Sequence, residues 1–176
     1  KKFYPRKKSY YKIRKLLGIK NDVFLIGHIA RFHPIKGHKI LLYSLKLLKK
    51  ENKNFRCLMI GTNIKKNASL EKQIRKNNLK ENIILYGETK FPHHLINSFD
   101  INIISSVSES SSLVLMEAMA CGIPTLSTNV GPLSKTIGQT GWVVKKNSVE
   151  ALAEKLILII QNKNSIKTKS ILARER

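Results

Sequence analysis

Short apolar runs of strand length alternate along the chain with segments in which apolar residues recur at helical spacing. The apolar runs predict strands at residues 23–29, 55–60, 82–86, 101–104, 124–128 and 141–144. The helical spacing predicts helices at residues 39–50, 70–78, 94–99, 113–121 and 148–162, and a short helix that opens at Gly131 and Pro132. Because this alternation is typical of βαβ units, we expect an α/β fold with a doubly wound, Rossmann-like parallel sheet.

The residues at the helix ends and at the ends of the chain predict helix caps and the boundaries of the domain. Ser148 is predicted to be the N-cap of the last helix, and Gly122 is predicted to close the helix at 113–121. The lysine-rich segments 1–20 and 163–176 lie outside the alternation. We therefore expect one folded domain at 21–162, preceded by a basic linker or edge segment and followed by the start of a truncated segment.

The predicted topology also indicates where a ligand binds. In doubly wound sheets, ligands bind beyond the carboxyl ends of the strands, where loops lead into helix N-termini. The predicted strands place five loops at that edge, at residues 28–37, 61–66, 87–92, 105–112 and 129–132. We expect the functional residues to lie in these loops.

The chain is strongly basic, with 33 Lys and Arg residues against 11 Asp and Glu and a formal net charge of +22. This balance implies a polyanionic partner: nucleic acid, an anionic membrane surface or a phosphorylated substrate. The alternative is a lysine-rich composition that makes ordinary solvated faces basic. No aromatic-interleaved nucleic-acid-binding motif occurs, so no nucleic-acid partner is expected. The longest apolar run, at residues 156–160, is too short to span a membrane.

Cysteine and histidine usage bears on localisation and metal binding. Cys57 and Cys121 lie among apolar residues and are predicted to be buried free thiols, which favours a cytoplasmic setting. An anionic membrane partner would place the protein peripherally, at the inner face of the membrane. The five histidines have no cysteine or carboxylate at a metal-ligand spacing, so no metal site is expected.

The segment 101–134 contains no Lys or Arg, and its only charged residues are Glu109 and Glu117. Glu117 lies inside the predicted helix at 113–121, where its same-face neighbours are apolar. A carboxylate in such company must find partners, because unpaired burial is unfavourable. It either caps a neighbouring loop or pairs with a core hydroxyl, or it accepts hydrogen bonds from the hydroxyls of a ligand, such as a ribose diol.

Two features in the predicted loops favour a phosphate-bearing ligand. The helix that starts at Ser112, Leu113 and Val114 offers free backbone N–H groups and the positive end of a helix dipole. Arg31 and Lys36 follow the first strand and can together hold a diphosphate, although they also read as two surface cations of a basic protein. Neither a Walker loop nor a dinucleotide-binding glycine motif is present.

Taken together, these spacings resemble the C-terminal half of retaining glycosyltransferases of family 4, which have the two-domain GT-B fold. The resemblance covers roughly residues 20–160. The matching residues are Gly27, Arg31, Lys36-Gly37, Tyr86-Gly87-Glu88, Asp100-Ile101, Ser108-Glu109, 117–124, 128–131 and 137–144. The specific part is a glutamate followed, after seven residues, by Glu-Ala-Met-Ala-Cys-Gly-x-Pro.

The resemblance implies roles around a donor diphosphate. Arg31 and Lys36 would act as catalytic residues that bind the diphosphate and stabilise the leaving nucleotide. The amides of Leu113 and Val114, which follow Ser112, would hold phosphate. Members of this family need no metal, so the resemblance implies no cofactor.

The resemblance also implies contacts at both ends of a nucleotide-sugar. Glu109 would be a third catalytic residue and contact the donor sugar, while Glu117 would bind the ribose hydroxyls. The loop near Thr89 would meet the nucleobase edge, and Gly27 belongs to the matched donor-binding motif. The nucleotide-sugar is thus the expected partner.

The chain departs from the family pattern after Glu109. Gly-Phe-Gly-like residues often stand at positions 110–112, where this chain has three serines. Pro132 and Lys135 stand where a second glycine and a glutamate are frequent. These departures leave the identity of the donor sugar open.

The resemblance implies that an N-terminal acceptor-binding domain is missing from this chain. The isolated chain is then expected to bind a donor without turnover, as half of a bacterial hexosyltransferase that modifies a surface glycan, such as capsule or lipopolysaccharide, or a lipid-linked acceptor. A nucleotide-sugar 2-epimerase with the same architecture and a non-catalytic polyanion-binding module are the alternatives. A glycosidase is disfavoured because Arg31 and Lys36 would have no phosphate to bind.

Overall fold

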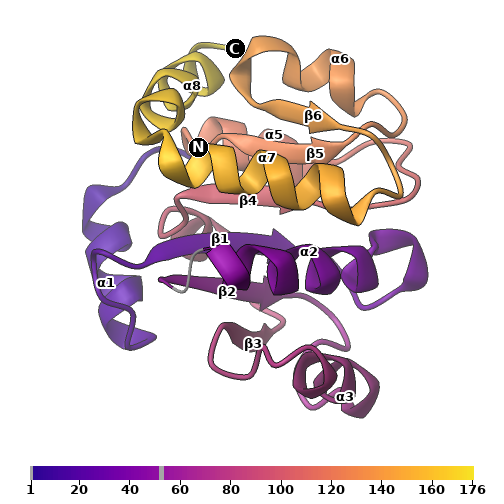
Figure 1. The fold of residues 1–176 in the computed structure, drawn as a ribbon. Helices are drawn as coiled ribbons and strands as arrows, with labels where there is room; N and C mark the ends of the chain where they lie inside the picture. Colours follow the sequence, from indigo (N-terminus) through magenta and orange to yellow (C-terminus); the bar gives the residue numbers. More distant parts are fainter. Residues whose placement is uncertain (1, 52–53) are drawn as a thin grey trace.

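The computed structural model describes residues 2–51 and 54–176 and is built around a six-stranded parallel sheet (Figure 1). The strand order is β3-β2-β1-β4-β5-β6. The strands are β1 (Phe24–Ile29), β2 (Phe55–Ile60), β3 (Ile83–Gly87), β4 (Ile101–Ile104), β5 (Thr125–Thr128) and β6 (Trp142–Val144). The expected α/β, doubly wound, Rossmann-like fold is confirmed.

Helices cover both faces of the sheet. One face carries α2 (His38–Glu51), α3 (Ala68–Lys76) and α7 (Val149–Gln161), and Figure 1 shows α2 and α7 side by side in front of the strands. The other face carries α1 (Lys7–Leu16), α4 (Pro92–Ile96) and α5 (Leu113–Ala120). Helices α6 (Leu133–Ile137) and α8 (Lys163–Glu175) pack with α5, and two short 3-10 helices, η1 (Pro34–Lys36) and η2 (Gly138–Thr140), complete the fold.

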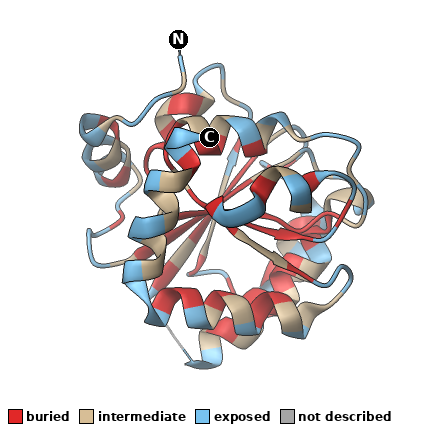
Figure 2. Ribbon diagram, turned by 90° about the horizontal axis from the view of Figure 1, so that it is seen from above, coloured by how far each residue is buried: buried red, intermediate tan, exposed pale blue. Residues whose placement is uncertain are grey.

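Successive residues along a strand point to opposite faces of the sheet and so pack into two different hydrophobic cores. Ile26 and Cys57 face the core under α2, α3 and α7, whereas their neighbours Leu25 and Leu58 face the core under α1, α4 and α5. Both faces of the sheet are therefore buried, which explains why the strand segments are mostly apolar and do not alternate between apolar and polar residues. Figure 2 shows the strands mainly in the colour of buried residues. Cys57 is buried, as is Cys121, and both are free thiols, as predicted.

The predicted caps are found close to their expected places. The Ser148 hydroxyl accepts a hydrogen bond from the Ala151 amide at 3.1 Å, which confirms Ser148 as the N-cap of α7. Cys121 is the C-cap of α5, and Gly122 follows it with a φ of 72°, in the left-handed region that glycine favours. The helix itself ends at Ala120, and Gly122 closes it as predicted, because its amide donates to the Met119 carbonyl at 2.8 Å.

The two lysine-rich ends differ from the sequence analysis, which assigned no element to them. Helix α1 packs on α4, and its Arg14 is fully buried, with Nη2 lying 2.5 Å from Asp100 Oδ2. Helix α8 is tied to the end of α5 by a hydrogen bond from the Ser170 hydroxyl to the Gly122 carbonyl. Residues 2–20 and 163–176 are thus integral to the packed structure; residue 1 lies outside the described residues.

A helix that crosses a lipid bilayer must have sufficient length and apolarity. Across residues 2–51 and 54–176, every helix falls short of them. This result agrees with the short apolar runs of the sequence.

Candidate functional site

The carboxyl ends of β1 and β4 lie side by side at the centre of the sheet. Ile26 pairs with Ile101, and Gly27 pairs with Asn102. The chain leaves β1 toward α2 on one face and leaves β4 toward α5 on the other face. Doubly wound sheets bind ligands at such a reversal, so the candidate site is centred here.

The two loops that leave these strands are held in close contact. The Val107 amide donates to the Ile35 carbonyl at 2.9 Å, and the Ser105 hydroxyl donates to the Lys36 carbonyl at 3.0 Å. Gly37 has a φ of 66°, and a Cβ at this position would lie 1.8 Å from the Ser105 carbonyl oxygen. Because only glycine permits this approach, Gly37 sets the spacing between the loops.

An ion pair joins the same two loops. Lys36 Nζ lies 2.7 Å from Glu109 Oε1, and the Ser106 hydroxyl donates to this oxygen at 2.7 Å. The side chains of Lys36 and Glu109 are 24% and 10% exposed. Partial shielding from water makes such a pair stronger than an exposed one. Lys36 and Glu109 therefore neutralise each other when no ligand is bound.

His28, on β1, supports this contact from the interior. Its Nε2 lies 3.3 Å from Ser105 Oγ. The single hydroxyl proton of Ser105 is donated to the Lys36 carbonyl, so Nε2 carries the proton that His28 donates to Ser105. Burial, reinforced by the neighbouring His38, holds the pKa of His28 well below its usual value. Burial also lowers the pKa of His38 to about 4, so both rings are neutral near pH 7.

Helix α5 begins at the edge of the same site. The Ser112 hydroxyl accepts a hydrogen bond from the Leu115 amide at 3.2 Å and forms the N-cap. The helix itself offers no acceptor to the amides of Leu113 and Val114, and the positive end of its dipole lies there. These amides are available to an anion.

A cavity of about 240 Å³ brings these groups together. Its lining includes His28, Lys36, Glu109, Ser111, Ser112, Leu113 and Val114. One ammonium, one carboxylate, serine hydroxyls and a helix N-terminus therefore surround one space. This arrangement can bind a phosphate between the ammonium and the helix, and a hydroxyl at the carboxylate.

The other predicted site residues, Gly27, Arg31, Thr89 and Glu117, do not line this cavity. Arg31 follows the end of β1 and is exposed. Gly27 lies within β1, where a Cβ would fall 2.0 Å from the Phe99 ring, so the structure gives it a packing role. Thr89 lies in the loop between β3 and α4, and its hydroxyl accepts a hydrogen bond from the Phe91 amide at 3.0 Å.

Glu117 projects from α5 with its carboxylate half-buried. Within residues 2–51 and 54–176 its half-buried carboxylate takes part in no hydrogen bond or ion pair. Burial raises the pKa of Glu117. The structural interpretation, in which Glu117 caps a loop or pairs with a core hydroxyl, therefore has no contact to support it. Glu117 lies one helical turn beyond Leu113, so a ligand at the helix start can extend toward it.

His28, Ser105 and Ser106 were not among the predicted site residues, although all three fall in the predicted loops at 28–37 and 105–112. Ser105 and Ser106 follow directly after the apolar run at 101–104, and this position is the signal that identifies them. His28 is a polar residue inside an apolar strand. Such a residue must find a partner, and the structure shows that the partner is Ser105.

Curated relatives of this chain are glycosyltransferases. The capsular polysaccharide biosynthesis glycosyltransferase CapM of Staphylococcus aureus is 29% identical over 155 residues, which cover 87% of this chain and 40% of CapM. The chain spans between 32% and 44% of the length of three such relatives. The relatives are thus longer proteins of which this chain matches one part.

Solved structures share the fold. Anabaena HepE in complex with UDP-glucose has a TM-score of 0.89 at 22% identity, with 98% of this chain and 48% of HepE covered. The C-terminal domain of a glycosyl transferase group 1 family protein, LpcC of Francisella tularensis, has a TM-score of 0.80 at 18% identity, with 99% and 93% covered. A family model described as glycosyl transferases group 1 matches residues 10–175. Since that match takes in nearly every element of the fold, the chain belongs to the group 1 family of glycosyl transferases.

Proposed function

We propose that this chain is the donor-binding half of a retaining, family 4 glycosyltransferase that transfers a hexose from a nucleotide-sugar to a surface glycan or lipid-linked acceptor. The observation that carries the proposal is the shared cavity of Lys36, Glu109 and the N-terminus of α5. The complex of HepE with UDP-glucose supports a nucleotide-sugar ligand, and the function of CapM in capsular polysaccharide biosynthesis supports a surface glycan.

The donor is proposed to lie across the carboxyl edge of the sheet. Lys36 and the amides of Leu113 and Val114 bind the diphosphate, and Glu109 binds a hydroxyl of the sugar. A cavity of about 240 Å³ is smaller than the 300–1,000 Å³ that is common for ligand sites, so it takes only part of the donor. The nucleoside extends along α5, where Glu117 accepts hydrogen bonds from the ribose diol.

Two further residues complete the proposed donor site. The exposed Arg31 guanidinium reaches the diphosphate from the solvent side, and the loop at Thr89 meets the nucleobase edge. The remaining wall comes from a second domain that also holds the acceptor. The isolated chain is therefore proposed to bind the donor without turning it over.

The transfer itself exchanges one C–O bond for another. The bond between the sugar's anomeric carbon and the diphosphate breaks, and a bond forms from that carbon to the acceptor hydroxyl oxygen. The hydroxyl proton leaves with the nucleoside diphosphate. Lys36 and Arg31 stabilise the charge on the departing diphosphate, a role that we propose they fill without a metal.

A first prediction concerns Glu117. Because its folded-state pKa is raised, the ionised carboxylate opposes folding, and this unfavourable contribution develops as the pH rises through its titration. Glu117→Gln is therefore expected to raise the Tm of the ligand-free chain at neutral pH and to leave it unchanged at acid pH. The same variant is expected to bind the nucleotide-sugar more weakly, because charged hydrogen bonds to the ribose are lost.

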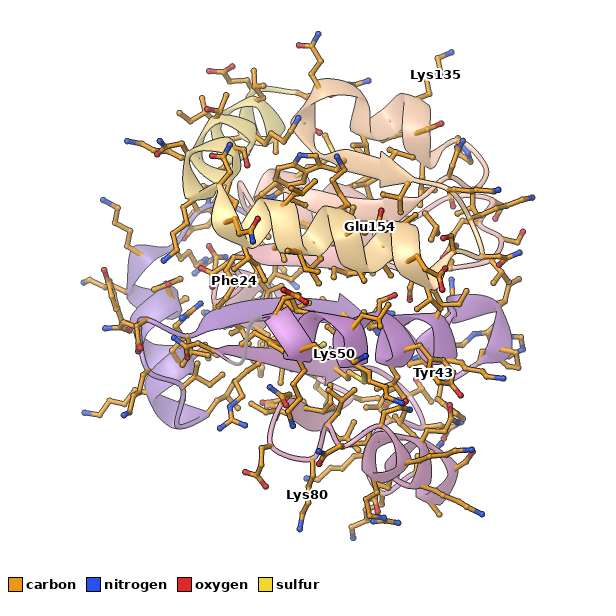
Figure 3. The ribbon with its side chains drawn as sticks, viewed as in Figure 1. Phe24, Tyr43, Lys50, Lys80, Lys135 and Glu154 are labelled. Atoms are coloured by element: carbon orange, nitrogen blue, oxygen red, sulfur yellow. The ribbon has the colours of Figure 1, made fainter. Side chains whose placement is uncertain are left out.

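A thermal-shift panel of UDP-, GDP- and ADP-sugars measures both effects. At a hundredfold excess over Kd the ligand stabilises the wild type by about 2.7 kcal/mol, and a hundredfold weaker variant retains only about 0.4 kcal/mol at the same concentration. Glu154→Gln, at an exposed position on α7 (Figure 3), is the matched control and should behave as the wild type. A Glu117→Gln chain that keeps the full ligand shift would contradict the proposed ribose contact.

A further inference from the structure

The outer face of α1 carries a stripe of cationic and apolar side chains. Lys8, Tyr11, Lys12, Lys15 and Leu16 are all exposed, and their spacing places them on one face of the helix. Tyr11 is 58% exposed and Leu16 is 71% exposed. No acidic residue occurs between residues 2 and 20, so nothing on this helix offsets the positive charge.

Contacts made by the opposite, inward side of α1 keep this stripe facing outward. Arg14 Nε donates to the Ser98 carbonyl at 3.1 Å and Arg14 Nη1 donates to the Val23 carbonyl at 2.8 Å, in addition to its ion pair with Asp100. These contacts fix the rotation of α1 about its own axis. Tyr11 and Leu16 therefore cannot turn inward, and their apolar surface stays in contact with water.

A groove of about 690 Å³ adjoins the stripe, between the N-terminal part of α1 and the loop from β3 to α4. Its cationic lining consists of Arg6, Lys7, Lys8 and Lys12. Its aromatic lining consists of Tyr4, Tyr86 and Phe91. Among the described residues, no carboxylate lines the groove; the exposed Glu88 precedes Thr89 at its end and is balanced by the exposed Lys90.

The aromatic side chains that line the groove are exposed to a large extent. Phe91 is 61% exposed and Tyr4 is 41% exposed. The Arg6 guanidinium carbon lies 4.0 Å from the centre of the Tyr4 ring. Aromatic rings and long cationic side chains in this combination are typical of the interface between water and lipid, where rings enter the headgroup layer and cations meet phosphates.

We infer that the outer stripe of α1 and the adjoining groove bind the surface of an anionic phospholipid bilayer. The cations supply attraction to the lipid phosphates, and Tyr11, Leu16 and Phe91 supply apolar area that leaves water on contact. Nucleic acid offers phosphates too, but it gives the exposed Leu16 no apolar partner. The lysines and Leu16 of this surface lie on α1, outside the proposed donor site, and the groove shares with that site only the loop at Thr89.

The test uses co-sedimentation with vesicles of phosphatidylcholine alone and of phosphatidylcholine mixed with phosphatidylglycerol. The wild type should bind only the mixed vesicles. The variant Lys8→Gln/Lys12→Gln/Lys15→Gln should bind them about a hundredfold more weakly, because each lysine near an anionic surface contributes about fivefold. These side chains are exposed, so the Tm should stay within a few degrees of the wild-type value.

The matched control removes the same charge elsewhere. Lys72→Gln/Lys76→Gln/Lys80→Gln changes exposed lysines on and just after α3, and Figure 3 shows Lys80 projecting outward from this part of the molecule, away from α1. This control should lose only a few-fold in vesicle affinity. Equal losses in the two triple variants would overturn the inference, because they would show that total charge and not this surface governs binding.

A second pair of variants tests the apolar component. Leu16→Gln should weaken vesicle binding severalfold, whereas Leu158→Gln, at a site that is 56% exposed on α7, should have no effect. An α1 triple variant that loses binding to duplex DNA but keeps vesicle binding would assign the surface to nucleic acid and sink the proposal. Binding of the nucleotide-sugar is measured in the same variants by thermal shift. A failure of the donor site can therefore be told apart from a failure of vesicle binding.

Discussion

Asp100→Ala is expected to lower the free energy of unfolding by about 3 kcal/mol, the lower end of the range for a broken buried ion pair. The substitution leaves the Arg14 guanidinium, with a side chain only 1% exposed, without its carboxylate. It also removes the acceptor for the Leu25 amide, which lies 2.7 Å from Asp100 Oδ2. The lower end applies because Asp100 is itself 23% exposed and Arg14 keeps its bonds to backbone carbonyls. Urea denaturation measures the loss.

Glu71→Ala is the control for this prediction, because Glu71 pairs with Arg75 at 3.7 Å in an exposed ion pair. Exposed pairs of this kind contribute about 0–1 kcal/mol. If Asp100→Ala lowers the free energy of unfolding much more than Glu71→Ala does, the contacts that join α1 to β1 and β4 contribute strongly to the stability of the fold. If the two variants lower the free energy of unfolding by similar amounts, the ion pair between Arg14 and Asp100 does not anchor α1.

The same junction explains which parts of the fold the sequence could predict. Strands β2 and β4 coincide with the predicted strands at 55–60 and 101–104, because a strand that is buried on both faces needs mostly apolar residues, and Arg56 and Asn102 are the only interruptions in these two strands. Helix α1 escaped prediction because its inward face carries Arg14, a charged residue. The partner that makes this burial favourable, Asp100, is 86 residues away in sequence. Local periodicity carries no information about such a contact.

Helix α8 escaped prediction for a related reason. Its only fully buried residue is Ala173, and it is held to the rest of the domain largely by polar contacts, such as that of Ser170 with the Gly122 carbonyl. A helix with so little apolar surface shows almost no hydrophobic stripe. Its place is decided by the surface that α5 and η2 offer to it, which is again a property of the tertiary structure.

For the candidate site, the sequence located the right loops but not the contacts between them. Lys36 and Glu109, 73 residues apart, were assigned to the diphosphate and to the sugar of one donor, whereas the structure shows them paired with each other. The pairing depends on the close approach of Gly37 to Ser105, which no spacing rule contains. Arg31, which the sequence grouped with Lys36, is exposed outside the cavity. Its proposed contact with the diphosphate remains a prediction.

Lys36→Met is expected to weaken binding of UDP, the nucleotide present in a HepE structure, by about 10- to 100-fold, because a charge-assisted hydrogen bond contributes about 1.5–3 kcal/mol. It is also expected to destabilise the ligand-free chain by about 1–2 kcal/mol, since Glu109 then keeps a largely shielded charge whose one remaining partner within residues 2–51 and 54–176 is the Ser106 hydroxyl. Thermal denaturation with and without UDP measures both quantities.

The partner substitution separates these two effects. Glu109→Gln removes the carboxylate that competes with phosphate for the Lys36 ammonium, so it should bind UDP as well as the wild type or severalfold better. The double variant Lys36→Met/Glu109→Gln carries no unpaired charge and should recover most of the lost stability, yet its affinity for UDP should stay as low as that of Lys36→Met. If the double variant recovers UDP binding together with stability, Lys36 acts only by holding the loops in place, and the diphosphate must lie elsewhere.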